Sequence, residues 1–248
     1  PIIGSVPQGH QFSGKLVLVT ETDQEWLQTN YNDQKAYVSR TSLLRVHPVN
    51  KAKGDIPIGT EKVNRWWGLP LEYEASDLVH LPAKYNTGGG KSYRLRREAA
   101  DACMKMLDAA REHGVNMLVH SAYRSGPRQK SIYQYNVKRY GLSQRHSAPP
   151  GHSEHQLGTT VDITDEQKKY YLSRSFDKIS QGKWLEKNAW KFGFTRSYTD
   201  ENVEETGYIS EPWHWRYVGT KKSLIWNYKR NGKKVSESKD KESPRGVE

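Results

Sequence analysis

The chain has 248 residues, enough to bury a sizeable hydrophobic core as one domain or as two modest ones. Only 34% of the residues are apolar, but eight tryptophans and fifteen tyrosines supply large side chains for burial, which excludes a disordered chain. The formal net charge of +11 predicts an affinity for anions, so nucleic acid, anionic lipid surfaces and acidic cell-wall polymers are the partner classes to weigh.

Residue usage narrows these classes. Basic residues are scattered through every segment and form no known nucleic-acid-binding motif, so we expect no nucleic-acid partner. The single cysteine, Cys103, excludes an internal disulfide framework, and any metal must be held by histidine and carboxylate. No apolar run reaches the ~20 residues that span a bilayer. The numbering begins at Pro1 without signal-peptide features, so we expect any signal segment or lipid anchor to lie outside it.

The first 50 residues predict a small all-β unit, because short apolar and β-branched runs alternate with polar turns. We expect strands at Lys15–Thr20, Glu25–Tyr31, Lys35–Val38 and Ser42–Val46. The pattern around Trp26 resembles bacterial SH3-like modules, and a plain β extension of the main domain is the alternative.

A charged, glycine- and proline-bearing stretch follows this unit and has no hydrophobic periodicity. We therefore place a small β module at residues 1–50, a linker at 51–60 and the main domain at 61–230. Residues 231–248 are rich in lysine, serine and glutamate with little to bury, which predicts a flexible tail.

The main domain begins its regular pattern with a helix. Apolar residues, Cys103 and Met106 among them, recur at helical spacing over Arg97–His113, and Gly114 follows as a typical helix terminator. We expect Cys103 and Met106 to be packing residues. The short apolar run Val115–His120 leads into a second helical pattern.

That second helix is expected over Pro127–Tyr140, and Arg124 precedes it on the connection from the apolar run, where functional groups concentrate. Further along, we expect strands at Thr159–Ile163 and Trp213–Val218, with a helix at Lys183–Phe192 between them. Because strands and helices mix without a regular βαβ repeat, the sequence predicts an α+β fold with a mainly antiparallel sheet flanked by helices.

Two of the nine histidines stand beside other ionisable residues in apolar segments. His155 precedes a glycine turn, and Asp162 lies inside a β-branched strand, where a buried carboxylate must be paired or bound to metal. Glu211 and His214 begin a second, aromatic-rich strand. Two imidazoles and a carboxylate suit catalytic zinc with an open water position, and Glu211 would serve as base. The alternative is hydrogen-bonded framework histidines and an Asp162 that caps a turn.

These segments carry a resemblance to a known family. S-E-H-Q-L-G-T-T-V-D at 153–162 resembles the signature S-x-H-x-x-G-x-x-x-D, and E-P-W-H at 211–214 resembles E-x-W-H, both of the VanY-like D-alanyl-D-alanine carboxypeptidases. These enzymes are LAS metallopeptidases, and the resemblance runs from about Leu78 to Gly219. The chain departs from the family at Ala122, where glycine is common.

The resemblance implies the LAS metallopeptidase fold and a role for each matched residue. It implies zinc as the cofactor, with Glu211 as the catalytic base. It implies that Arg124 stabilises substrate carbonyl or carboxylate oxygens, and that Gln129 and Ser153 position the terminal D-alanine. The metal ligands that it implies are His155, Asp162 and His214.

The implied function is a zinc carboxypeptidase that removes the terminal D-alanine from peptidoglycan stem peptides, either D,D on pentapeptides or L,D on tetrapeptides. Such an enzyme would act outside the cytoplasm, in the periplasm or cell wall, as a monomer, with stem peptides and anionic wall polymers as partners. An endopeptidase of the same family is an alternative if the site is an open groove. A non-catalytic zinc-bearing wall-binding module is another, although such a module needs no Glu211.

Overall fold

The computed structural model describes most of the chain after residue 54 and four strands before it. The described residues are 15–19, 24–31, 34–39, 45–46, 55–89, 93–141, 144 and 147–230. The tail predicted at 231–248 lies outside them.

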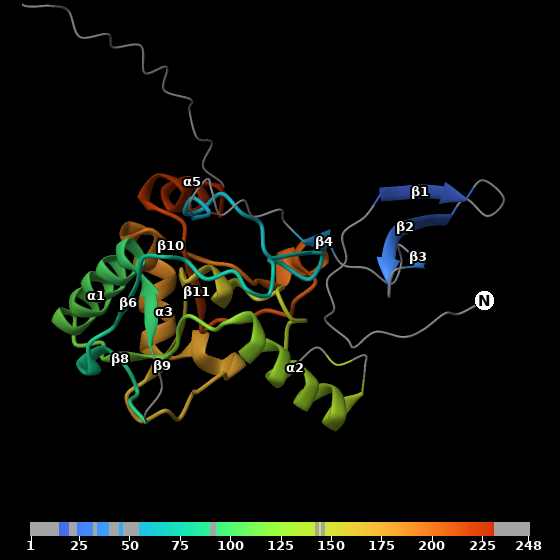
Figure 1. Ribbon diagram of the computed structural model, residues 1–248. Helices are drawn as coiled ribbons and strands as arrows, with labels where there is room; N and C mark the ends of the chain where they lie inside the picture. The colour runs from blue at the N-terminus through green and yellow to red at the C-terminus, as the bar shows by residue number, and fades with distance from the viewer. Residues whose placement is uncertain are drawn as a thin grey trace, which may run out of the picture.

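The N-terminal strands form a three-stranded antiparallel sheet in the order β1-β2-β3, drawn in blue in Figure 1. They are β1 (Lys15–Val19), β2 (Gln24–Tyr31) and β3 (Gln34–Ser39), each within a residue or so of the expected strand. The fourth strand is shorter than expected: β4 (Arg45–Val46) pairs in parallel with β5 (Trp67–Gly68) and not with this sheet. The SH3-like assignment and the domain boundaries stay predictions.

The main domain is built on a four-stranded sheet in the order β10-β11-β9-β8, and every neighbouring pair is antiparallel. The strands are β8 (Met117–Ser121), β9 (Thr160–Asp165), β10 (Phe194–Arg196) and β11 (His214–Tyr217). A separate hairpin joins β6 (Leu78–His80) to β7 (Arg94–Arg96). The sheet confirms the predicted α+β class.

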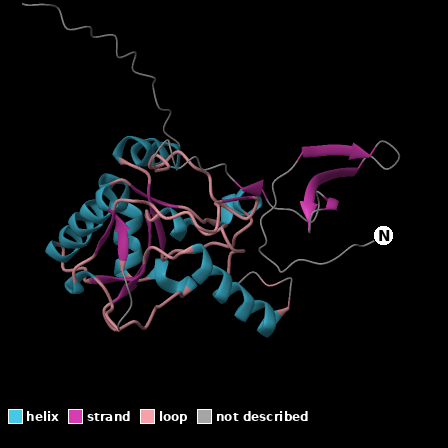
Figure 2. Ribbon diagram, viewed as in Figure 1, coloured by secondary structure: helices cyan, strands magenta, loops and turns pink. Residues whose placement is uncertain are grey.

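Five α-helices accompany the sheet in the described part of the chain (Figure 2). They are α1 (Arg97–Glu112), α2 (Gly126–Tyr140), α3 (Ser180–Asn188), α4 (Val203–Thr206) and α5 (Thr220–Arg230). Short 3₁₀ helices are η3 (Ala83–Tyr85), η4 (Glu154–Leu157), η5 (Arg174–Lys178), η6 (Ala189–Phe192) and η7 (Asp200–Asn202). Within the described residues, no helix has both the length and the apolar composition that crossing a bilayer requires.

The two faces of the sheet differ because side chains alternate along each strand. Val161 and Ile163 of β9 and Trp215 of β11 are buried in one apolar cluster with the inner faces of α1 and α3. Cys103 and Met106 belong to that cluster, which confirms them as packing residues. The alternate residues of β9 and β11 face the other side, where polar groups gather.

Residues 55–60, the second half of the predicted linker, pack against the main domain. Ile56 is buried in a smaller cluster with Leu69 and Leu157. The Asp55 carboxylate accepts hydrogen bonds from the backbone N–H and the hydroxyl of Ser76. This packing brings the chain before β5 against η4, the short helix that carries His155.

Gly158 closes the turn after η4 and offers a test of how tightly that turn is held. Its φ is +72°, and an added Cβ would lie 2.7 Å from Leu78 Cδ2 and 3.2 Å from Arg96 Cγ. Gly114 has nearly the same φ, +71°, but an added Cβ would meet nothing within 4 Å. We expect Gly114→Ala to lower the free energy of unfolding by ~1 kcal/mol through the backbone alone.

Gly158→Ala adds crowding to the same backbone cost, so we expect a loss of about 2–4 kcal/mol. Denaturant unfolding of the two variants measures the difference. Equal losses of unfolding free energy in the two variants would show that the side chains of Leu78 and Arg96 move aside without measurable cost.

Candidate active site

The sheet register brings the predicted metal ligands together. Asp162 of β9 and His214, the first residue of β11, are direct partners in the antiparallel pairing. Directly opposed residues project their side chains to the same face of a sheet. His155 lies on η4, and the turn at Gly158 leads the chain from this helix into β9. The three side chains therefore meet on the polar face.

The donor atoms of the cluster lie close enough to share one metal ion. His155 Nε2 is 3.2 Å from Asp162 Oδ2, and His214 Nδ1 is 3.1 Å from Asp162 Oδ1. One ligand atom from each residue lies within 4.8 Å of the others. Ligands that each bind zinc at ~2.0–2.2 Å in a tetrahedron are about 3–3.5 Å apart. The residues thus fit a zinc-sized ion.

Burial and charge hold Asp162 in the form that binds a cation. Burial alone would raise the pKa of this carboxyl, but the imidazoles of His155 and His214 hold it well below its usual range. Burial alone would lower the pKa of His214, but its hydrogen bonds to Asp162 and Glu154 raise the pKa to about 10. A positive charge is therefore favoured at this cluster.

Glu211 lies beside the cluster in the segment just before β11. Its Oε2 is 3.6 Å from His214 Nδ1. Burial, aided by the negative charge of Asp162 and opposed by His214, raises the pKa of Glu211 to about 7. A carboxyl with this pKa gains and loses a proton readily near neutral pH, as a general base must.

Arg124 lies between β8 and α2, and its backbone N–H donates to the carbonyl oxygen of His155, 3.2 Å away. Its guanidinium Nη2 donates to Ser153 Oγ at 3.4 Å, while its buried Nε has no hydrogen-bond partner among the described residues. Part of its donor capacity is therefore left for an anion.

Gln129 of α2 is buried, with 1% of its surface exposed. Its Nε2 donates to the carbonyl oxygen of Ala148 at 2.7 Å, and its Oε1 has no hydrogen-bond partner among the described residues. The amide is therefore fixed with its oxygen free to accept.

A pocket of 550 Å³ joins these groups. All seven residues singled out in the sequence line it: Arg124, Gln129, Ser153, His155, Asp162, Glu211 and His214. A second hollow of 480 Å³ adjoins it, since Arg124, Asp162 and Tyr171 line both. The structure brings all the predicted site residues to one place, while the role of each stays a prediction.

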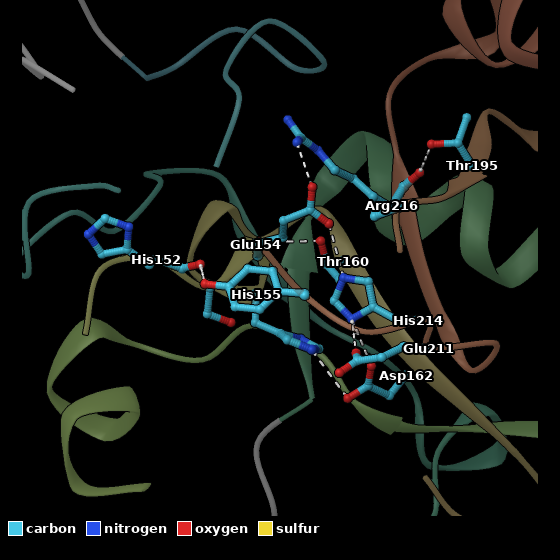
Figure 3. Close-up of polar contacts among 12 residues, drawn as sticks. His152, Glu154, His155, Thr160, Asp162, Thr195, Glu211, His214 and Arg216 are labelled. Carbon is cyan, nitrogen blue, oxygen red and sulfur yellow. Dashed lines mark hydrogen bonds and ion pairs between the residues drawn. The ribbon is translucent and has the colours of Figure 1, made fainter. Parts of the chain in front are cut away.

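Three further residues surround the cluster, and the sequence did not single them out. Figure 3 shows two of them, Glu154 and Arg216. Glu154 Oε2 accepts from His214 Nε2 at 3.0 Å, and Glu154 Oε1 accepts from Arg216 Nη1 at 2.9 Å. The ring of Tyr198 stacks on His214 with centroids 4.5 Å apart. Two signals were present: Glu154 sits inside the first motif, and Arg216 follows His214 at strand spacing. Tyr198 has no such signal.

A His-Asp-His cluster beside a half-buried glutamate, in a pocket that also holds an arginine, is the arrangement of a metallohydrolase site. The sequence model of the VanY family, D-alanyl-D-alanine carboxypeptidase, matches residues 92–220. The chain belongs to this family.

Individual relatives agree with this assignment. The putative carboxypeptidase YodJ of Bacillus subtilis is 39% identical over 166 residues, which cover 66% of this chain and 61% of that protein. The structure of the LdcB LD-carboxypeptidase covers 69% of this chain and 80% of its own, with 38% identity and a TM-score of 0.63. The chain spans less than two thirds of the length of the curated relatives that it matches.

A second solved structure is a point mutant of the vancomycin-resistance D,D-pentapeptidase VanY, in complex with Zn(II). It is 29% identical, covers 68% of this chain and 93% of its own, and has a TM-score of 0.56. The two structures confirm the fold that the motifs implied.

The cluster should hold about one zinc ion per chain. His155→Ala should lose this ion, because the variant keeps only two of the three protein ligands that a catalytic zinc site uses. The matched control is His80→Ala, since His80 is exposed and lies on β6. Elemental analysis of both variants, purified without chelator, measures the metal. A His155→Ala protein that keeps full zinc would show that the ion binds elsewhere.

Proposed function

We propose that this chain is a zinc-dependent carboxypeptidase that removes the terminal D-alanine from peptidoglycan stem peptides. The observation that carries the proposal is the position of Glu211 beside the His155–Asp162–His214 cluster, in one pocket with Arg124. Family membership supports it, as does the Zn(II) complex of the VanY neighbour.

His155, Asp162 and His214 would hold the zinc ion. When bound, zinc supplies a Lewis acid that lowers the pKa of a water to about 7 and polarises the scissile carbonyl. The donor set suits this metal, because imidazole and carboxylate are common ligands of catalytic zinc. Cys103, the one thiol of the chain, lies on α1 and is buried in the core cluster, so it takes no part in binding the metal.

Glu211 would move the protons of the reaction. Its carboxylate takes a proton from the attacking water, and the resulting carboxylic acid passes it to the amine of the leaving D-alanine. Burial serves this role because a carboxyl with a pKa raised to about 7 can both take up and release a proton at neutral pH.

Arg124 would bind the carboxylate of the terminal D-alanine. A guanidinium offers parallel N–H donors that match a carboxylate, and the Nε of Arg124 is not committed to another described group. Ser153, which accepts from the same guanidinium, and Gln129, which has a free Oε1, would orient the terminal residue.

Recognition of a free carboxylate favours removal of a terminal residue over cleavage within a chain. The adjoining hollow lined by Tyr93, Arg94 and Tyr171 offers room for the rest of the stem peptide. The neighbours include an LD-carboxypeptidase and a D,D-pentapeptidase, so both specificities belong to the proposal. Activity outside the cytoplasm, in the periplasm or cell wall, follows from the substrate, and a surface with net charge +11 suits anionic wall polymers.

The proposal is tested with defined muropeptides and the variant Glu211→Gln. Wild-type protein should release D-alanine, detected by mass, from a pentapeptide, a tetrapeptide or both, which also decides between the two specificities. Glu211→Gln keeps the size of the side chain but removes the base, so kcat should fall ~10²–10⁴-fold. Zinc content should be unchanged.

Glu204→Gln is the matched control, because Glu204 is exposed on α4 and should turn over at the wild-type rate. A zinc-loaded Glu211→Gln protein that still cleaves as fast as wild type would refute the mechanism. Cleavage only within cross-linked peptides would indicate the endopeptidase alternative, and zinc binding without cleavage would indicate a binding module.

Arg124→Lys tests carboxylate recognition, because lysine keeps the charge but loses the paired donors. We expect kcat/KM on a peptide with a free C-terminus to fall about 10–100-fold, in line with ~1.5–3 kcal/mol for a hydrogen bond to a charged group. On the same peptide with an amidated C-terminus, kcat/KM of the wild type should already be low, and Arg124→Lys should not lower it further. Equal losses on both peptides would place Arg124 at a carbonyl oxygen.

A further inference from the structure

Glu154 is a buried carboxylate for which the mechanism above has no use. Only 5% of its surface is exposed, yet both of its oxygens have partners. Oε1 accepts from Arg216 Nη1 at 2.9 Å, and Oε2 accepts from His214 Nε2 at 3.0 Å. Arg216 in turn donates through Nη2 to the carbonyl oxygen of Glu61 at 2.6 Å. Figure 3 shows Glu154 between the guanidinium and the imidazole.

The two imidazoles of the cluster are presented through different nitrogens. His155 Nδ1 lies 2.7 Å from the carbonyl oxygen of Ala122, which can only accept, so Nδ1 carries the proton and Nε2 faces Asp162. His214 is reversed: its Nε2 faces Glu154, and its Nδ1 faces Asp162 and Glu211. A metal ion at the cluster must therefore bind His214 through Nδ1.

A neutral imidazole has one N–H and one lone pair, so this binding requires the proton of His214 to stay on Nε2. The hydrogen-bond partner of Nε2 is Glu154 Oε2, and Arg216 Nη1 donates to the other oxygen of the same carboxyl, so this carboxyl is held facing the imidazole. We propose that Glu154 is a positioning residue, anchored by Arg216, that fixes His214 in the tautomer that binds the metal through Nδ1.

The positions of Glu154 and Arg216 in the sequence explain how this ion pair comes to lie beside His214. Glu154 is adjacent to His155 on η4, so one dipeptide supplies a metal ligand and the residue that orients the other histidine. Arg216 is two residues beyond His214 on β11, and residues two apart share a face of a strand. The proposal rests on the proposed function only for the identity of the metal.

The test is the zinc affinity of Glu154→Gln, measured by competition with a chromogenic chelator. Loss of an outer hydrogen-bond partner of a metal-bound histidine typically weakens metal affinity 10–100-fold, and we expect a loss in this range. Glu186→Gln is the matched control, because Glu186 pairs with Arg196 at 2.9 Å in an ion pair that is also largely buried but lies outside the site. It should lower the melting temperature of the metal-free protein and leave zinc affinity unchanged.

If Glu154→Gln loses stability like the control and keeps wild-type zinc affinity, Glu154 only holds the fold and the proposal is wrong. If Glu154→Gln fails to fold, a measurement on the wild-type protein still tests the proposal. A long-range ¹H–¹⁵N spectrum of the zinc-loaded protein should show His214 protonated at Nε2 and metal-bound at Nδ1, and His155 the reverse. The opposite assignment for His214 overturns the proposal. Neither measurement uses a substrate, so failure here and failure of the proposed reaction are distinguishable.

Discussion

The antiparallel register between β9 and β11 is the constraint on which the site depends. It sets Asp162 opposite His214, and it sets Val161 opposite Trp215. The first pair supplies two of the three side chains of the His155–Asp162–His214 cluster, and the second lies in the apolar core. A slip of one residue would turn Trp215 to the polar face and His214 into the core. Core packing therefore protects the geometry of the site against a one-residue slip, because that slip would also expose large apolar side chains.

The three carboxyls around the cluster differ in their partners, and their chemistry differs accordingly. Asp162 contacts two imidazoles, and Glu154 contacts an imidazole and a guanidinium, so their partners hold the pKa of each well below its usual range despite burial. Among the described residues, the Glu211 carboxylate makes only a long contact, to His214, so burial prevails and raises the pKa of Glu211 to about 7. One small region thus contains two carboxyls whose pKa values are lowered and one whose pKa is raised, a separation of pKa values that is typical of acid-base sites.

The sequence predicted what depends on local pattern. The apolar stripe of α1 and the glycine that ends it predicted that helix to within a residue, and the β-branched run at Asp162 predicted β9. Six of the seven site residues lie in the two motifs or in the connection before α2, and Gln129, within α2, was implied by the family resemblance. Periodicity could not predict contacts between distant segments: Glu154 meets His214 across 60 positions, and nothing in the local sequence of Tyr198 indicates that it stacks on that imidazole.

Periodicity also could not predict the role of residues 61–73, which lie on either side of β5. This segment has no hydrophobic periodicity, yet it supports the site from outside the four-stranded sheet. Gln156, the residue after His155, donates from Nε2 to the carbonyl oxygens of Pro70, Leu71 and Tyr73. These bonds fix η4 from one side. The bond from Arg216 to the Glu61 carbonyl ties the same segment to β11. The backbone of residues 61–73 therefore contacts both elements that carry His155 and His214, and it can do so because its irregular conformation leaves carbonyl oxygens free to accept. A regular strand or helix there would have used those oxygens itself.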